Sequence, residues 1–157
     1  MLADVRAGQP VHRPVLVELK VPAGTFEGRE RTITVTEPLP TIEAQGREYA
    51  ACKVRRLGAG GLVGPDEPPI SIGRSRSCQV RVADPAVSKV HASIHRDGAS
   101  GQYLVVDEGS RNGTRIDGEL IPAHAATALW SGAYLTLGRV AFVFLEPAAL
   151  RTLARLA

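Results

Sequence analysis

Short stretches in which apolar and polar residues alternate recur along the whole chain. In the stretch 15–21 the odd positions are valine or leucine, and Glu18 and Lys20 stand between them. Because successive side chains of a strand point to opposite faces, this pattern predicts a strand that buries its odd-numbered face. Further strand-like stretches are 33–36, 49–57, 70–72, 80–82, 92–95, 103–106, 133–137 and 140–145.

Turn signals separate these stretches at short intervals, and the chain contains 16 glycines and 11 prolines. Asp117-Gly118 lies between two short stretches, 114–116 and 119–121, and predicts a type I′ hairpin, because both central positions of that turn take positive φ. Gly138-Arg139 separates the last two stretches in the same way. Many short strands with regular turns predict an all-β protein, built as an antiparallel β-sandwich.

The end of the chain has a different period. Pro147 is followed by leucines at positions 150, 153 and 156, which is the spacing of one helix face, so a short C-terminal helix is expected over 147–157. The remainder divides into a β-rich extension, 1–46, and a sandwich, 47–146. The Gly- and Pro-rich segment 58–69 is interpreted as a loop within the sandwich. The pattern leaves open whether the extension joins the sandwich or forms a separate hairpin, which would be marginally stable alone.

Length and charge narrow the class of protein. With 157 residues, of which 44% are hydrophobic and 22% charged, the chain has the composition of one globular domain. The net charge is +3 and no run of Lys or Arg occurs, so a nucleic-acid partner is not expected. No apolar stretch is long enough for a membrane span, and the N-terminus lacks a signal pattern. We therefore expect a cytoplasmic protein; the oligomeric state stays open.

The cysteines and histidines predict neither a metal site nor a cofactor. Cys52 and Cys78 each lie in a strand-like stretch and are interpreted as small core residues. His91 and His95 are four positions apart, but no cysteine or carboxylate follows them at the spacing of a metal site.

Two enzyme-like patterns are weak. The glycines of segment 58–61 resemble a nucleotide-binding loop, but the Gly-x-Gly-x-x-Gly spacing fails at Val63. Ser88, His91 and Asp107 could be drawn as a catalytic triad, yet no nucleophile elbow is present, and Ser88 and His91 lie on one loop. The sequence therefore predicts a protein that is not an enzyme.

Polar residues gather in three loops, 73–80, 83–91 and 107–114, that separate the central strands. Together the loops offer guanidinium and ammonium groups, hydroxyls, and glycines that expose backbone N–H groups, which are the parts of a phosphate-binding site. The cationic side chains are Arg74, Arg76 and Lys89, and the hydroxyls are those of Ser75, Ser77, Ser88 and Ser110.

The ordered motifs of these loops resemble the forkhead-associated (FHA) domain, whose pattern is Gly-Arg, then Ser-x-x-His, then Asn-Gly-Thr followed by a second Asn-Gly. The resemblance covers about residues 48–146, and the segments 129–132 and 137–138 also fit it. The matching motifs are Gly73-Arg74, Ser88-Lys89-Val90-His91, Ser110-Arg111-Asn112-Gly113-Thr114 and Asp117-Gly118.

This resemblance implies a sandwich that binds a phosphothreonine-containing protein or peptide through the loops at one end. By position, Arg74 and Ser88 would contact the phosphate, and Lys89 would add charge. Arg111 would touch the phosphate or the peptide, and Asn112 would hold the peptide backbone. Ser110 is also expected at the binding surface, whereas Gly73, His91, Gly113 and Thr114 would shape the loops.

Three positions depart from the family pattern, and simpler interpretations remain. Lys89 stands where Arg is commoner, Asp117 replaces an Asn, and Ala133 replaces an Asp. Asn112-Gly113 could be only a hairpin turn, since Asn-Gly is a strong hairpin signal. The alternative function is an FHA-type scaffold that associates with partners without recognising phosphate.

Overall fold

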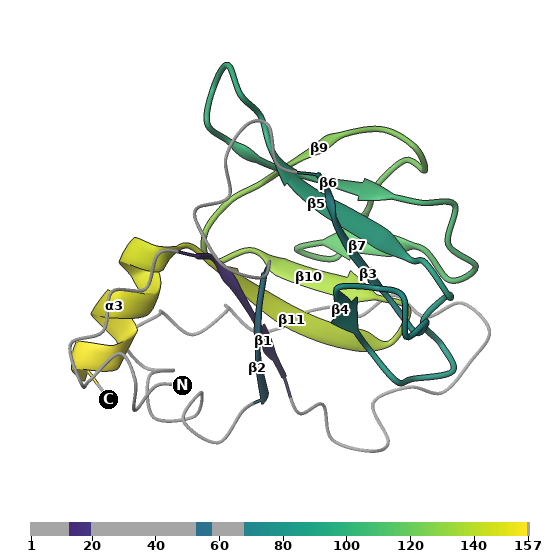
Figure 1. The fold of residues 1–157 in the computed structure, drawn as a ribbon, viewed down its shortest axis with the longest axis horizontal. Coiled ribbons are helices and arrows are strands. Elements are labelled where there is room, and N and C mark those ends of the chain that lie inside the picture. Colours follow the sequence, from purple (N-terminus) through teal and green to yellow (C-terminus); the bar gives the residue numbers. More distant parts are fainter. Residues whose placement is uncertain (1–12, 20–52, 58–67, 157) are drawn as a thin grey trace.

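The computed structural model describes residues 13–19, 53–57 and 68–156. Within these residues the chain forms two β-sheets that pack on each other, followed by a helix, α3 (Pro147–Leu156) (Figure 1). The first sheet has the order β2-β1-β11-β10-β7-β8 and the second the order β4-β3-β5-β6-β9. The predicted all-β sandwich and C-terminal helix are therefore confirmed.

The strands are short. The first sheet contains β1 (Val15–Glu18), β2 (Lys53–Arg56), β7 (Thr114–Ile116), β8 (Glu119–Leu120), β10 (Tyr134–Leu137) and β11 (Val140–Leu145). The second contains β3 (Ile70–Gly73), β4 (Val80–Arg81), β5 (Ala92–Arg96), β6 (Tyr103–Asp107) and β9 (Thr127–Leu129). No helix in the described part of the chain is long and apolar enough to cross a bilayer.

The core lies between the two sheets and follows the alternation of the sequence. On β6, the alternate residues Tyr103, Val105 and Asp107 are buried, and those between them are half-buried. The rings of Tyr103 and Phe144, one from each sheet, lie with their centroids 5.2 Å apart at an interplanar angle of 60°, a favourable tilted arrangement. Burial of alternate positions thus joins the two sheets into one core.

β1 differs from its prediction. Leu16 is the residue of this strand that joins the central core, and it is fully buried opposite Phe144 of β11. Val15 and Val17, which were expected to face the core, are also buried, each 1% exposed, on the other face of the strand. β1 pairs with both β2 and β11, so residues 15–18 extend the sandwich. The predicted stretch 33–36 lies outside the described residues.

One pair of strands departs from the expected antiparallel pattern: β3 and β4 pair in parallel, with Ile72 opposite Val80. β9, which pairs antiparallel with β6, was not predicted as a strand. Cys78 lies in the loop between β3 and β4, and not in a strand, although it is buried as expected. Cys52 lies outside the described residues.

The predicted hairpin is confirmed. Asp117 and Gly118 have φ values of 48° and 88°, as a type I′ turn requires, and they join β7 to β8. The Asp117 carboxylate also accepts the Tyr134 N–H at 2.8 Å, which ties this hairpin to β10. The aspartate in place of the family's asparagine is therefore accommodated by the fold.

Strand direction gathers several connections at one end of the sandwich. β3, β6 and β10 end there, while β5, β7 and β11 begin there, as the pairing of Ala92 with Asp107 and of Thr114 with Leu137 shows. We call this end the loop end. It consists of the first loop (74–79), the second loop (82–91), the third loop (108–113) and the β10–β11 turn, Gly138-Arg139 (Figure 1).

Candidate functional site

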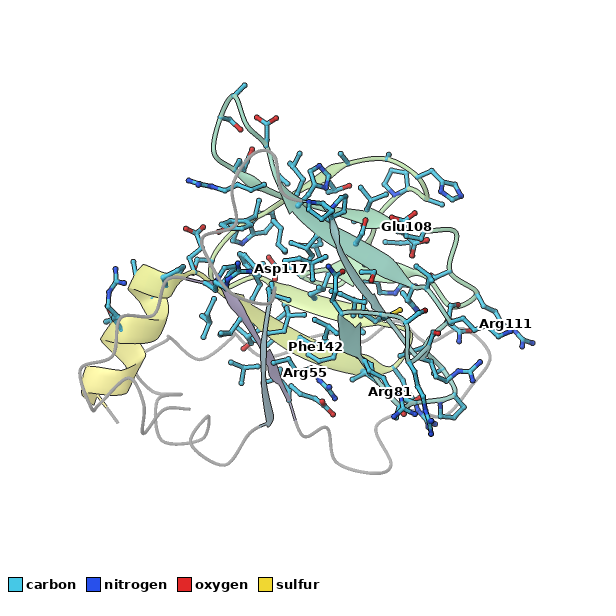
Figure 2. All side chains as sticks on the ribbon, in the orientation of Figure 1. Arg55, Arg81, Glu108, Arg111, Asp117 and Phe142 are labelled. Atoms are coloured by element: carbon cyan, nitrogen blue, oxygen red, sulfur yellow. The ribbon has the colours of Figure 1, made fainter. Side chains whose placement is uncertain are left out.

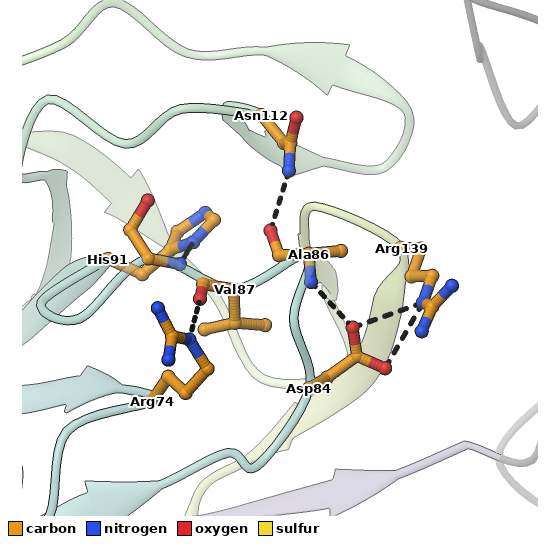
Figure 3. A network of polar contacts seen from close by, with 8 residues as sticks. Arg74, Asp84, Ala86, Val87, His91, Asn112 and Arg139 are labelled. Atoms are coloured by element: carbon orange, nitrogen blue, oxygen red, sulfur yellow. Dashed lines mark hydrogen bonds and ion pairs between the residues drawn. The ribbon is translucent and has the colours of Figure 1, made fainter.

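The segment 86–88 of the second loop is the meeting point of the site (Figure 3). Residues from the first and third loops bond to it, so Arg74, Ser88 and Asn112 are brought together although they are far apart in sequence. The bonds run from Arg74 Nε to the Val87 carbonyl at 3.2 Å, from the Arg111 N–H to Ser88 Oγ at 3.0 Å, and from Asn112 Nδ2 to the Ala86 carbonyl at 2.8 Å.

The first loop lies directly against the backbone of the second. The Arg74 N–H donates to the Ser88 carbonyl at 2.9 Å, and the Ser75 N–H donates to the Lys89 carbonyl at 3.0 Å. A Cβ atom at Gly73 would lie 2.3 Å from the Lys89 carbonyl oxygen, a backbone atom that could not move aside easily. Glycine at this position is therefore what allows the two loops to touch.

His91 joins the second loop to the third from inside the fold. The ring is fully buried; Nδ1 accepts the Ser88 N–H at 3.0 Å, and Nε2 lies 3.1 Å from the Gly113 carbonyl, to which it donates when the ring is neutral. Burial lowers the pKa of His91, against the opposing effects of the Gly113 carbonyl and the Asp107 carboxylate. Both ring nitrogens are engaged by backbone groups, so the ring does not face the Ser88 hydroxyl as a catalytic base would.

The third loop is organised around the buried carboxylate of Asp107. It accepts the Ser110 N–H at 2.8 Å, the Ser110 hydroxyl at 2.6 Å and the Thr114 hydroxyl at 2.6 Å. Burial raises the pKa of Asp107, but these hydrogen bonds outweigh it and hold the pKa below the usual value. Ser110 Oγ also accepts the Gly113 N–H at 2.9 Å. We therefore propose that Ser110 shapes the loop, in place of the ligand contact expected from the motif.

The topology decides between two interpretations of Asn112-Gly113. β6 belongs to the five-stranded sheet and β7 to the six-stranded sheet, so the third loop crosses from one sheet to the other. Asn112-Gly113 is therefore not the turn of a hairpin. Gly113, with φ of 77°, allows the chain to turn while Asn112 stays exposed beside the second loop.

The exposed charge at the loop end is mainly cationic. Arg74, Arg76, Lys89 and Arg111 are all exposed, and Arg111 projects outward at this end (Figure 2). The carboxylates of the same loops accept hydrogen bonds within the protein, as Asp107 does. Asp84 binds Arg139 and the Ala86 N–H, and Glu108 accepts the Ser93 hydroxyl.

The hydrogen bonds also decide which atoms remain for a ligand. Among the described residues, the Arg74 guanidinium donates through Nε, so its terminal Nη groups can donate outward. Ser88 Oγ accepts one bond and keeps its own hydrogen to donate. Asn112 uses Nδ2, which leaves Oδ1 to accept. A site with these groups suits a small anion attached to an extended peptide.

The groups that hold these side chains in place could not be identified from the sequence. The carbonyls of Ala86 and Val87 have no side-chain signature. Asp84 and Arg139 form an ion pair but are 55 residues apart, and no motif connects them. Among the residues that the structure describes, no group of three His, Cys, Asp or Glu side chains could hold a metal ion.

Comparison with known proteins agrees with this architecture. The model of the FHA domain family matches residues 70–138. The glycogen accumulation regulator GarA of Mycolicibacterium smegmatis is 34% identical over 130 residues, which cover 83% of this chain and 75% of that protein. The mouse (Mus musculus) angiogenic factor with G patch and FHA domains 1 is 42% identical over 55 residues, or 34% of this chain but only 8% of that protein.

Solved structures share the fold. The FHA domain of the CT664 protein from Chlamydia trachomatis superposes with a TM-score of 0.53 at 19% identity, covering 85% of this chain and 97% of that one. The N-terminal FHA domain of S. cerevisiae Rad53p, solved with a phosphothreonine peptide, has a TM-score of 0.52 at 20% identity, covering 64% of this chain and 89% of that one.

The fold and the polar loop end define a binding module built on a β-sandwich. With the family model over its central strands and a relative matched along most of both chains, the chain belongs to the FHA domain family.

Proposed function

We propose that the chain binds phosphothreonine peptides at the loop end and acts in phosphorylation-dependent protein–protein interaction, without enzymatic activity of its own. One observation carries the proposal: Arg74, Ser88 and Asn112 converge on the segment 86–88, each with a group left to bind a ligand. The Rad53p domain, which has the same fold, was solved with such a peptide.

The phosphate is assigned to the first and second loops. Phosphothreonine carries about −1.5 to −2 charges and three acceptor oxygens at neutral pH. The Nη groups of Arg74 donate to two of these oxygens, and the Ser88 hydroxyl donates to the third. Lys89 and Arg111 are exposed nearby and add positive charge, Lys89 as a point charge in place of an arginine fork.

The peptide backbone is assigned to Asn112. Because Nδ2 is bound to the Ala86 carbonyl, the orientation of this amide is set before a ligand arrives. Oδ1 then accepts an N–H of the peptide next to the phosphothreonine. The third loop binds the peptide backbone, and the first and second loops bind the phosphate. Recognition of the peptide therefore requires that these loops are held together.

We also propose that the protein is cytoplasmic. Protein kinases use ATP to phosphorylate threonine, and a protein that binds phosphothreonine is expected in the cytoplasm, where protein kinases and ATP are both present.

The domain boundaries 1–46, 47–146 and 147–157 stay a prediction.

Fluorescence anisotropy with a phosphothreonine peptide and its unphosphorylated form tests the proposal. We expect binding of the phosphorylated peptide only, and a loss of about 30-fold or more in Arg74→Ala, since truncating one partner of a hydrogen-bonded charge pair costs ~2–5 kcal/mol. The matched control is Arg96→Ala, which removes an exposed arginine at the other end of β5. Equal affinity for both peptides would favour the scaffold function.

A further inference from the structure

The β10–β11 turn reaches the binding loops through an ion pair. Arg139 Nε donates to both carboxylate oxygens of Asp84, at 3.0 and 3.1 Å (Figure 3). Asp84 Oδ1 also accepts the Ala86 N–H at 2.8 Å. The guanidinium therefore orients a carboxylate that in turn holds the backbone of the second loop at Ala86.

The other side of Ala86 is held by the third loop and by the turn itself. Its carbonyl accepts Nδ2 of Asn112 at 2.8 Å. A Cβ atom at Gly138 would lie 2.5 Å from the same carbonyl oxygen, so the turn packs tightly against it. The Gly138 N–H donates to the Gly113 carbonyl at 3.1 Å, next to Asn112 in the chain. Ala86 is thus fixed between Asp84 and Asn112.

From these contacts we propose that Arg139 is a positioning residue for Asn112, acting through Asp84 and Ala86. The inference rests on the proposed function, in which Asn112 Oδ1 accepts from the peptide backbone. Without the ion pair, Ala86 loses a restraint on its N–H. Its carbonyl then no longer presents one fixed acceptor to Asn112, and the amide samples orientations that do not fit the peptide.

A direct contact between Arg139 and the peptide makes the opposite prediction for Asp84. The Arg139 side chain is 49% exposed and charged, so a direct contact with the ligand is the alternative role to be tested. In that case removal of Asp84 would free the guanidinium, and binding would be unchanged or tighter. If Arg139 is a positioning residue, loss of Asp84 weakens peptide binding as loss of Arg139 does. The double variant then has about the same peptide affinity as the single variant that binds less tightly.

The first measurement uses the free protein. Asn112 is the only asparagine in the chain, so selective ¹⁵N-asparagine labelling gives one side-chain NH₂ pair in an NMR spectrum. We expect this pair to shift toward the position of a solvent-exposed amide in Arg139→Ala and in Asp84→Ala, to shift less in Arg139→Lys, and to stay unchanged in Arg96→Ala. An unchanged pair in both Arg139→Ala and Asp84→Ala would overturn the proposal.

The second measurement is peptide affinity, by anisotropy, for the same single variants and for the double variant. The pair is partly exposed, so each single variant should weaken binding by about 2- to 5-fold, with thermal unfolding showing that the fold is kept. Full affinity in Arg139→Ala, tighter binding in Asp84→Ala, or additive losses in the double variant would contradict positioning. If the unaltered protein binds no phosphothreonine peptide, the proposed function fails, and the Asn112 spectrum still decides whether Arg139 orients this amide.

Discussion

The three loops of the loop end and the turn between β5 and β6, at the opposite end of the sandwich, are held in place in different ways. At the loop end, hydrogen bonds connect one loop to another. The His91 ring, for example, accepts the Ser88 N–H in the second loop and bonds to the Gly113 carbonyl in the third. At the opposite end, the turn after β5 closes on itself: Asp97 accepts the N–H and the hydroxyl of Ser100. Bonds of the first kind fix loops relative to each other, whereas those of the second kind fix only their own turn.

Hydrogen bonds between loops prepare the surface of the loop end for binding. Polar residues are present at both ends, so polarity alone does not distinguish them. At the loop end, the first, second and third loops are held in fixed positions relative to one another before any ligand arrives. Binding therefore requires less ordering of these loops. Matched substitutions at the two ends test this contrast.

The largest effect is expected for His91→Ala. The substitution leaves the Ser88 N–H without its acceptor, removes one of the two donors to the Gly113 carbonyl and empties a fully buried site, so the free energy of unfolding should fall by roughly 2–5 kcal/mol. Asp97→Ala removes bonds within an exposed turn and should lower stability less. Urea denaturation measures both variants, and peptide affinity should fall in His91→Ala alone. Equal losses of stability would remove the distinction between the two ends.

A pair of glycines gives the next effect. A methyl group at Gly73 would meet the Lys89 backbone at 2.3 Å, so Gly73→Ala should lower stability by about 1–3 kcal/mol and weaken peptide binding as the first two loops separate. At Gly101, with φ of 72°, the atoms nearest to an added Cβ belong to the flexible side chain of Arg96. Gly101→Ala should lower stability by about 1–2 kcal/mol and leave affinity unchanged. A loss of affinity in Gly101→Ala would argue that general destabilisation, and not loop separation, weakens binding.

A pH effect should follow from the buried histidine. The pKa of His91 in the folded protein lies below its usual value of 6.5, so below that pH the unfolded chain binds the proton more readily than the folded chain does. This contribution to stability is therefore present above pH 6.5 and decreases as the pH falls through the folded pKa. Urea denaturation between pH ~7.5 and 5 should show a shallower pH dependence in His91→Gln than in the unaltered protein. Identical slopes would show that His91 does not control stability over this range.

The smallest effect is expected for Arg76→Ala. This exposed residue of the first loop makes no side-chain hydrogen bond or ion pair with the described residues, so its contribution is long-range attraction to the phosphate. Affinity should fall by about 2-fold at low salt and by less at high salt, because exposed charges are screened. Arg96→Ala, with the same change in net charge, should have no effect at either salt concentration.

Much of the fold could be predicted because its strands obey a local rule. Alternation identified Tyr103–Val106, and Asp117-Gly118 identified its hairpin from the φ values that the turn requires. The parallel pairing of β3 with β4 could not be predicted, since two residues of β4 contain no information about their neighbour. The burial of both faces of β1 depends likewise on which strands and segments lie around it.

The site divides in the same way. Arg74, Ser88 and Asn112 could be singled out from motifs because their side chains have recognisable chemistry. Their supports could not: the Ala86 carbonyl is a backbone atom, and Asp84 meets Arg139 only through the fold. The ligand contact expected of Ser110 stays a prediction; its hydroxyl donates to the Asp107 carboxylate and accepts the Gly113 N–H.

A crystal structure of the chain with a phosphothreonine peptide would show whether Arg74, Ser88 and Asn112 bind the ligand together. We expect the phosphate within hydrogen-bond distance of the Arg74 guanidinium and the Ser88 hydroxyl, and a peptide N–H on Oδ1 of Asn112, whose Nδ2 remains on the Ala86 carbonyl. A phosphate bound on another face, or a peptide held without Arg74 and Asn112, would contradict this expectation.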